Sequence, residues 1–249
     1  IPSDMVGPNV RFHVSDFVAT WTRGRGAGAG ADRSILVRDF YENHAGRFGI
    51  IQSTGMTANA RNIVHFLKGA MTTGRLRWLR PLKSLLQYPA LVAAWVFGRA
   101  TIFATVLEDR PYHENRVTIL PEEPDSIYFE YRIHEELRVR VRAFRRLYKK
   151  AFRRHWAFVL TPEVNLNFGH ACGTCRLGLD HSQSVIDREN RCHDLQNLYI
   201  VDGSCFASSG GVNPSLTIAA LALRAGAILS AKLTGARGGL AAGAEGSGG

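Results

Sequence analysis

Two polar residues in the last third of the chain are of types that could carry out a proton transfer. His170 lies within NFGHACGTCRLG, and an imidazole there could act as a general base because its ordinary pKa is near neutral pH. Asn213 and Pro214 stand directly before a long apolar segment. Because asparagine is a preferred N-cap and proline suits the first helical position, a helix should begin here. A hydrogen-bonded structural histidine and a well-capped core helix would explain the same residues without catalysis.

The predicted helix runs to about Leu233 and should be buried, because apolar residues cover almost its whole circumference. Its N-terminus carries a partial positive charge and free N–H groups, and Gly210 and Gly211 before it would let a bulky ligand approach. The preceding segment, NLYIVDGS, is predicted as a short buried strand that ends at Asp202-Gly203. Ligands gather at the carboxyl ends of such strands in α/β sheets.

The four cysteines also fall in this last third of the chain. The Cys172-x-x-Cys175 pair could bind zinc or act as a redox pair. A second closely spaced pair is missing, and Cys192, His193 and Cys205 would have to complete a zinc site, so no metal is expected. Four cysteines in 249 residues do not form a disulfide scaffold. A cytoplasmic setting is therefore the default expectation, and localisation is otherwise open.

Upstream, the sequence predicts a sheet followed by a basic helix. A short strand is expected over 12–20, and alternating apolar residues predict three antiparallel strands in sequence order within 101–133. Residues 134–155 have apolar side chains at three- or four-residue steps and carry nine Arg or Lys against two Glu. This pattern predicts an amphipathic helix packed across the sheet, although its basic face could also bind nucleic acid or anionic lipid.

Two further segments allow more than one interpretation. Residues 85–106 are the most apolar run, and we expect a buried helix followed by a core strand. A membrane span, or a surface that docks on a membrane or an apolar substrate, is an alternative there. The Gly/Ala-rich residues 23–32 contain G-x-G-x-x-A, but no clear helix follows, so a flexible surface loop is expected rather than a dinucleotide loop.

Three stretches together resemble the glucose–methanol–choline (GMC) flavin oxidoreductases. HACGTCRLG is similar to that family's His-x-x-Gly-Thr-Cys-Arg-x-Gly, and residues 184–229 resemble its closing strand, loop and helix almost position by position. VGPNVRFH, at residues 6–13, resembles a Val-Gly-x-Asn-x-x-x-His element of the family. The hairpin sequence LEDRPYHENRVTIL also resembles the start of its substrate-domain sheet.

The resemblance implies a role for each matching residue. His170 corresponds to the histidine that takes the hydroxyl proton of an alcohol while hydride moves to flavin N5. Asn213 corresponds to the second member of the catalytic pair and would hold the substrate oxygen. The positions expected to contact FAD are Asp202, Gly203, Asn213, Pro214, Ser215 and Thr217.

The implied fold is α/β (α+β). It combines an antiparallel-sheet substrate domain with covering helices and the closing strand and helix of a Rossmann-like FAD-binding domain whose N-terminal part is absent. We expect residues 1–22 near the domain junction, 23–166 as the substrate-binding domain, 167–233 completing the FAD domain and active site, and 234–249 as a disordered tail.

The expected function is FAD-dependent oxidation of a CH–OH group in a small-molecule alcohol, with oxygen or another compound as electron acceptor. The chain resembles a C-terminal fragment, because the family's dinucleotide-binding glycine motif precedes the matched region. One alternative is a catalytically inactive remnant or subunit of a GMC-type protein, and another is a basic nucleic-acid-binding module built on 134–155. The presence of both His170 and Asn213 favours the enzyme, with no nucleic-acid partner. The substrate is not revealed.

Overall fold

The computed structural model describes residues 3–21, 34–43, 46–56, 63–64, 68, 78, 81, 85, 87–161 and 164–245. The chain forms two compact units. Unit 1 comprises residues 1–13, 108–137 and 166–249, and unit 2 comprises residues 14–107 and 138–165. This division groups 108–137 with the C-terminal segment, whereas the predicted domain 23–166 placed it with the rest of the sheet. The Gly/Ala-rich stretch 23–32 lies outside the described residues.

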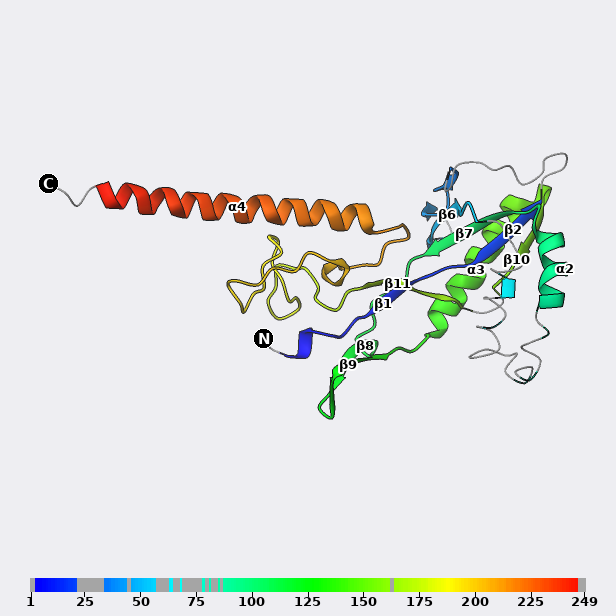
Figure 1. Ribbon diagram of the computed structural model, residues 1–249, viewed down its shortest axis with the longest axis horizontal. Coiled ribbons are helices and arrows are strands. Elements are labelled where there is room, and N and C mark those ends of the chain that lie inside the picture. Colours follow the sequence, from blue (N-terminus) through cyan, green and yellow to red (C-terminus); the bar gives the residue numbers. More distant parts are fainter. Residues whose placement is uncertain are drawn as a thin grey trace. The chain divides into compact units, whose positions relative to one another are not determined.

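Unit 2 is built around strand β7 (Thr101–Leu107), which is buried over most of its length. β7 pairs antiparallel with β2 (Phe17–Trp21) and with β6 (Gly49–Ser53), and the last residue of β1 (Arg11–Val14) pairs with Leu107 (Figure 1). β10 (Trp156–Val159) extends the sheet beyond β2, and β3 (Leu36–Val37) extends it beyond β6. A separate short pair joins β4 (Glu42–Asn43) to β5 (Gly46–Arg47).

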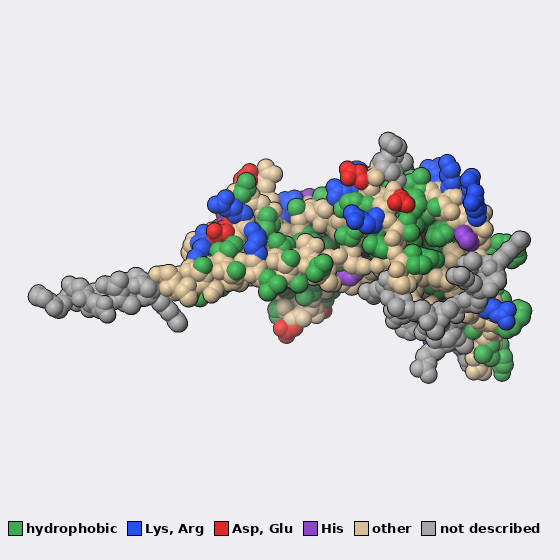
Figure 2. All heavy atoms as spheres, turned by 90° about the horizontal axis from the view of Figure 1, so that it is seen from above, with side chains coloured by type: hydrophobic (Ala, Val, Ile, Leu, Met, Phe, Trp, Pro, Cys, Tyr) green, Lys and Arg blue, Asp and Glu red, His purple; other side chains and the backbone are tan. Residues whose placement is uncertain are grey.

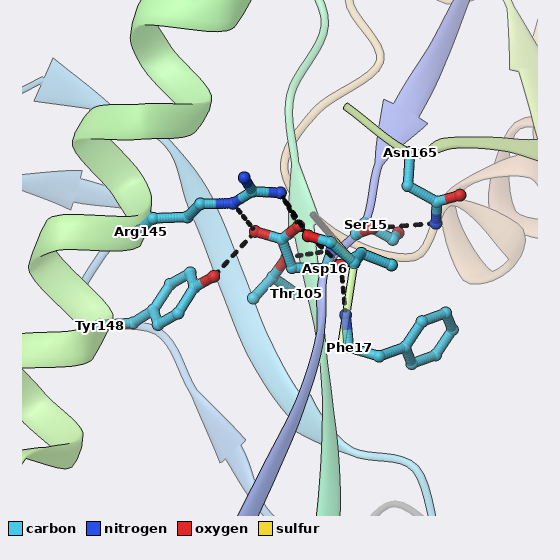
Figure 3. A network of polar contacts seen from close by, with 8 residues as sticks. Ser15, Asp16, Phe17, Thr105, Arg145, Tyr148 and Asn165 are labelled. Atoms are coloured by element: carbon cyan, nitrogen blue, oxygen red, sulfur yellow. Dashed lines mark hydrogen bonds and ion pairs between the residues drawn. The ribbon is translucent and has the colours of Figure 1, made fainter. Parts of the chain in front are cut away.

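The strand predicted over 12–20 is interrupted at Ser15 and Asp16, between β1 and β2. The break has a polar cause. Asp16 is buried, and its carboxylate accepts hydrogen bonds from Arg145, Tyr148 and the hydroxyl of Thr161 (Figure 3). Its backbone N–H donates to Thr105 Oγ1 at 2.8 Å instead of to a strand partner.

Helix α3 (Glu135–Ala151) confirms the predicted basic amphipathic helix, and a single 3-10 turn at Phe152–Arg154 follows it. Its apolar stripe is buried, as the three- or four-residue spacing predicted, through Leu137, Val141, Phe144 and Tyr148. Within unit 2, the Phe144 ring stacks on Phe48 with centroids 5.6 Å apart. The basic outer face is thus the solvent side of a helix packed on the sheet.

Helix α2 (Gln87–Phe97) precedes β7 in the order expected for 85–106, but the prediction that this helix is buried is wrong. Only Ala90 is buried, and Trp95 is 83% exposed. The helix is held at its C-terminal end, where Trp21 Nε1 donates to the Val96 carbonyl and the Trp21 and Phe97 rings pack together. Overall apolarity does not indicate how many faces of a helix are covered.

In unit 1, β8 (Arg116–Leu120) and β9 (Glu123–Glu130) form a two-stranded hairpin. The prediction of one sheet over 101–133 in sequence order is therefore wrong, because β7 belongs to a different sheet from β8 and β9. The segment between β7 and β8 contains Asp109, whose buried side chain accepts a hydrogen bond from Tyr131. β11 (Leu166–Cys172) lies beside β1 and carries His170.

The segment predicted as a buried strand over 197–204 is not a strand. Its only described pairing is an isolated bridge between Arg191 and Tyr199, and Gly203–Cys205 forms a single 3-10 turn. This part of unit 1 is instead held by a small core of Val185, Ile186, Cys192 and Cys205. The strand prediction rested on a short apolar run, which packs here against that core without a neighbouring strand.

The last helix, α4, spans Ser215–Glu245 and so continues beyond Leu233, through most of the segment predicted as a disordered tail. The helix is not buried as predicted: apart from Ala225 its described residues are exposed or partly exposed, including Leu216 and Leu223. Figure 2 shows hydrophobic side chains along it. In length and composition Ser215–Gly235 could cross a membrane, which by itself is weak evidence for a span.

Candidate active site

Two histidines meet where β1 lies beside β11. His13 Nδ1 is 3.2 Å from His170 Nδ1, and the two rings are nearly perpendicular, at 86°. His170 is half-buried, whereas His13 is fully buried. The base expected from the sequence is therefore in contact with a second imidazole, which the sequence analysis did not single out as a site residue. The signal was present, because His13 closes the VGPNVRFH element.

The second nitrogen of His13 faces the loop that leads to α4. Its Nε2 lies 2.7 Å from the carbonyl oxygen of Ser209 and 3.1 Å from that of Gly210. Burial lowers the pKa of His13, and the neighbouring His170 lowers it further, while the two carbonyls oppose the shift. His13 is therefore a neutral imidazole at physiological pH and joins β11 to the 209–210 loop.

A buried arginine fixes the same loop to β1. Arg11 donates from Nη1 to the Ala207 carbonyl at 2.6 Å and from Nη2 to the Phe206 carbonyl at 3.0 Å. The guanidinium passes against Gly173, where a Cβ atom would lie 2.6 Å from the Asn9 carbonyl oxygen and closer still to Arg11 Nη2. Gly173 also has φ +94°, so glycine is required here for space and for conformation. This explains the glycine of HACGTC in structural terms.

Asn213 follows this loop directly and is partly buried. The cap of α4 is displaced by one residue from the prediction, since the Pro214 carbonyl accepts the first helical hydrogen bond, from Ile218 at 3.0 Å. The described contacts thus connect His170, through His13, to Gly210, three residues before Asn213. The structure brings the two predicted catalytic residues into neighbouring parts of one unit.

The residues predicted to contact FAD lie in two places. Gly203 packs against β11, where a Cβ atom would be 2.9 Å from the Ala171 carbonyl oxygen, next to His170. Asp202 is exposed and caps the short turn by accepting from the Ser204 N–H at 2.8 Å. Ser215 and Thr217 are exposed in the first turn of α4, whereas Pro214 is buried. An exposed helix N-terminus presents backbone N–H groups that favour an anionic ligand.

Asp109 is a further buried titratable residue that sequence reasoning missed. Tyr131 Oη donates to its Oδ2 at 2.6 Å, while Oδ1 is buried without a hydrogen-bond partner among the described residues. Burial raises the pKa of Asp109 to about 6, and the Tyr131 hydrogen bond partly opposes this shift. Its backbone exchanges hydrogen bonds with the Ser209 hydroxyl, so it supports the loop that contacts His13.

The cysteines next to the site are thiols with little reactivity. Cys172 and Cys205 are buried, and burial raises the pKa of each to about 11. At neutral pH both are protonated, and a protonated thiol is neither a nucleophile nor a metal ligand. The described residues contain no cluster of three or more potential metal-ligating side chains.

A comparison of the sequence with known protein families identifies relatives of this segment. The family model described as GMC oxidoreductase matches residues 111–222, which include His170, Asn213 and the start of α4. This part of the chain therefore belongs with the GMC oxidoreductases.

Individual relatives match over a limited part of the chain. 6'''-Hydroxyparomomycin C oxidase of Streptomyces lividus is 47% identical over 68 residues, which are 27% of this chain and 12% of that protein. Cholesterol oxidase of Acinetobacter baumannii is 40% identical over 94 residues, 37% of this chain and 17% of the relative. The large subunit of fructose dehydrogenase of Gluconobacter japonicus is 44% identical over 66 residues, 26% of this chain and 12% of that protein.

A solved structure shares the fold over most of the chain. Pyridoxine 4-oxidase from Mesorbium loti aligns with a TM-score of 0.50 at 14% identity, covering 89% of this chain and 42% of the solved chain. The mixed α/β architecture with antiparallel sheets is thus shared with that oxidase. The chain spans well under half of the length of the relatives and the solved structure that it matches.

Proposed function

We propose that this chain is part of an FAD-dependent oxidoreductase that converts a CH–OH group to a carbonyl. The observation that carries the proposal is the half-buried His170, held by a neutral partner and placed in the same unit as Asn213 and an exposed helix N-terminus. A base, a hydrogen-bonding amide and a site for a flavin are the groups that alcohol oxidation needs.

In the proposed reaction, His170 takes the proton from the substrate hydroxyl, and the O–H electron pair stays on the substrate oxygen. The amide of Asn213 holds that oxygen. FAD, when bound, supplies N5 as the acceptor of the hydride that leaves the carbinol carbon. The sum would be a carbonyl product, one proton on His170 and one hydride, which is a proton with two electrons, on the cofactor.

The residues of the chain fit the cofactor in charge and in space. The N-terminus of α4 offers backbone dipoles that stabilise negative charge on a reduced flavin without reorganisation. Ser215 and Thr217, both exposed in its first turn, provide hydroxyl groups beside that site. Asp202 and Gly203, next to β11, are proposed to bind the ribityl and pyrophosphate region.

We also propose that α4 belongs to the FAD-binding domain of the full-length protein. The helix is apolar, yet only 6% of its most hydrophobic window is buried in this chain. A domain packed on that face would bury Leu216 and Leu223 and stabilise each by roughly 1.5–3 kcal/mol.

The test is a visible spectrum of the full-length gene product, purified in the presence of FAD, followed by anaerobic addition of alcohols. The named relatives suggest the probes to include: cholesterol, D-fructose, an aminoglycoside and a series of primary alcohols. We expect bound-flavin absorbance and its bleaching by at least one alcohol. A folded protein that takes up no flavin with FAD in excess would contradict the proposal and favour a catalytically inactive GMC-type protein.

A further inference from the structure

We propose that His13 is a positioning residue that sets the tautomer of His170, so that the proton of neutral His170 sits on Nδ1 and Nε2 is the nitrogen that acts as base. This inference rests on the proposed role of His170 for its consequence in catalysis. The tautomer itself follows from the contacts of the two imidazoles alone.

The contacts of His13 Nε2 determine where its own proton lies. The two atoms that face this nitrogen are the carbonyl oxygens of Ser209, at 2.7 Å, and Gly210, at 3.1 Å. A carbonyl oxygen only accepts hydrogen bonds, so Nε2 of His13 must carry the proton. If Nε2 of buried His13 were unprotonated, its lone pair would face the lone pairs of the two carbonyl oxygens, and no hydrogen bond could form.

The position of the proton on His170 follows from the position of the proton on His13. A neutral imidazole has one donor and one acceptor nitrogen, so Nδ1 of His13 is an acceptor. The atom 3.2 Å from it is Nδ1 of His170, which must therefore donate. The perpendicular rings, at 86°, allow a ring-plane N–H of one imidazole to point at the lone pair of the other.

Full protonation of His13 would exchange the donor and the acceptor, because Nδ1 of His13 would then carry a proton and donate to Nδ1 of His170. The environment opposes that charge: His13 is fully buried, and burial and the adjacent His170 both lower its pKa. Among the described residues, no carboxylate lies at hydrogen-bond distance from His13; the Ser209 and Gly210 carbonyls and, more weakly, the Glu108 carboxylate favour the cation, and burial outweighs them. The neutral form holds above the lowered pKa.

The fixed tautomer has a chemical consequence. With the proton on Nδ1, the lone pair of His170 is on Nε2, the ring nitrogen that does not contact His13. When Nε2 takes a proton from a hydroxyl, the Nδ1–H bond to His13 becomes charge-assisted and strengthens. His13 thus stabilises protonated His170 more than neutral His170, in the manner of the oriented partner behind a catalytic base.

The experiment is two-bond ¹H–¹⁵N correlation NMR on the full chain, labelled with ¹⁵N-histidine, at pH 7.5. The His170 signals are assigned by their loss in His170→Asn. We expect the protonated-nitrogen signal of His170 on Nδ1 and its unprotonated signal on Nε2, with the opposite pattern for His13. Detection of wild-type His170 as the Nε2–H tautomer would overturn the proposal, whether or not the protein binds flavin or oxidises alcohols.

Two variants separate the acceptor role of His13 from its packing. His13→Asn keeps an acceptor oxygen near the position of Nδ1 and should retain the Nδ1–H tautomer of His170. His13→Leu removes the acceptor and should lose it, leaving both tautomers populated. Retention of a pure Nδ1–H tautomer in a folded His13→Leu protein would also overturn the proposal. If that variant does not fold, the wild-type and His13→Asn spectra decide.

A matched control comes from another perpendicular pair of histidines in the same unit. The rings of His181 and His193 lie 5.4 Å apart at 88°, compared with 5.2 Å and 86° for His13 and His170. His193 Nε2 is hydrogen-bonded to Ser184 and not to His181. His181→Phe should therefore leave the tautomers of His193 and His170 unchanged. That result would show that loss of a neighbouring imidazole ring does not by itself change the tautomer of a histidine.

Discussion

Arg11 and Gly173 lie so close together that no other residue could replace the glycine without moving the arginine. The guanidinium crosses the position where a Cβ of residue 173 would stand, and continues to the carbonyls of Phe206 and Ala207. One short contact therefore couples β1, the end of β11 and the loop that leads to α4. This coupling supports the loop whose carbonyls contact His13.

Gly173→Ala should consequently destabilise the protein. The added methyl would displace Arg11, and φ +94° would be strained for alanine. Overpacking of this kind costs about 1–3 kcal/mol, measured as a lower midpoint of urea unfolding. Gly226→Ala is the control, because nothing lies within 4 Å of its Cβ position in α4 and alanine favours a helix by up to about 1 kcal/mol. Equal stabilities for the two variants would refute this account of Gly173.

The buried ion pair of unit 2 provides a second prediction. Arg145 contacts both carboxylate oxygens of Asp16, at 2.8 Å and 2.5 Å (Figure 3). Arg145→Ala leaves a buried carboxylate without its counter-charge, and should cost about 3–5 kcal/mol of unfolding free energy. Arg146, the next residue on α3, is exposed, so Arg146→Ala should change stability by less than about 0.5 kcal/mol. Similar losses for both variants would show that the ion pair does not hold α3 to the sheet.

The pKa of Asp109 provides a prediction with a defined sign. Burial raises it from 3.8 to about 6, so the folded protein binds more protons than the unfolded chain between these values. The stability contributed by protonated Asp109 should therefore be lost as the pH rises through that window. Tyr131→Phe removes a hydrogen bond that favours the carboxylate, and should raise the pKa further.

The measurement for Asp109 is a carbon NMR titration of its carboxyl group, assigned by Asp109→Asn. Tyr128→Phe is the control, because Tyr128 is bonded to Glu123 and belongs to the same part of the chain. A carboxyl group that titrates near 4 in the wild type, or that shifts equally in both tyrosine variants, would disprove the environment described for Asp109.

The sequence predicted best the features that depend on local patterns. The apolar spacing of α3 gave its location and its buried stripe, because Leu137, Val141, Phe144 and Tyr148 fall on one face of a helix. The motif around His170 indicated the family, and the family model matches this part of the chain. One of its small residues, Gly173, is needed for close packing against Arg11.

The predictions that failed concern which elements become neighbours. The patterns of β7, β8 and β9 are those of strands, but nothing local to them determines that β7 pairs with β2 and β6 and not with β8. The apolar sequences of α2 and α4 predicted burial, although neither helix is covered in this chain. Pairing and burial depend on residues far away in the sequence, and His13 was missed for the same reason, since 157 positions separate it from His170.

The measurement that tests the central claim most directly is stopped-flow reduction of the bound flavin by an alcohol in the full-length protein, for the wild type and His170→Ala. His193→Ala is the matched control, since His193 lies in the same unit and its Nε2 is bonded to Ser184. If His170 is the base, the variant should keep its flavin and reduce it about 10²–10⁴-fold more slowly, with the control unchanged. Flavin reduction at the wild-type rate in His170→Ala would contradict the account.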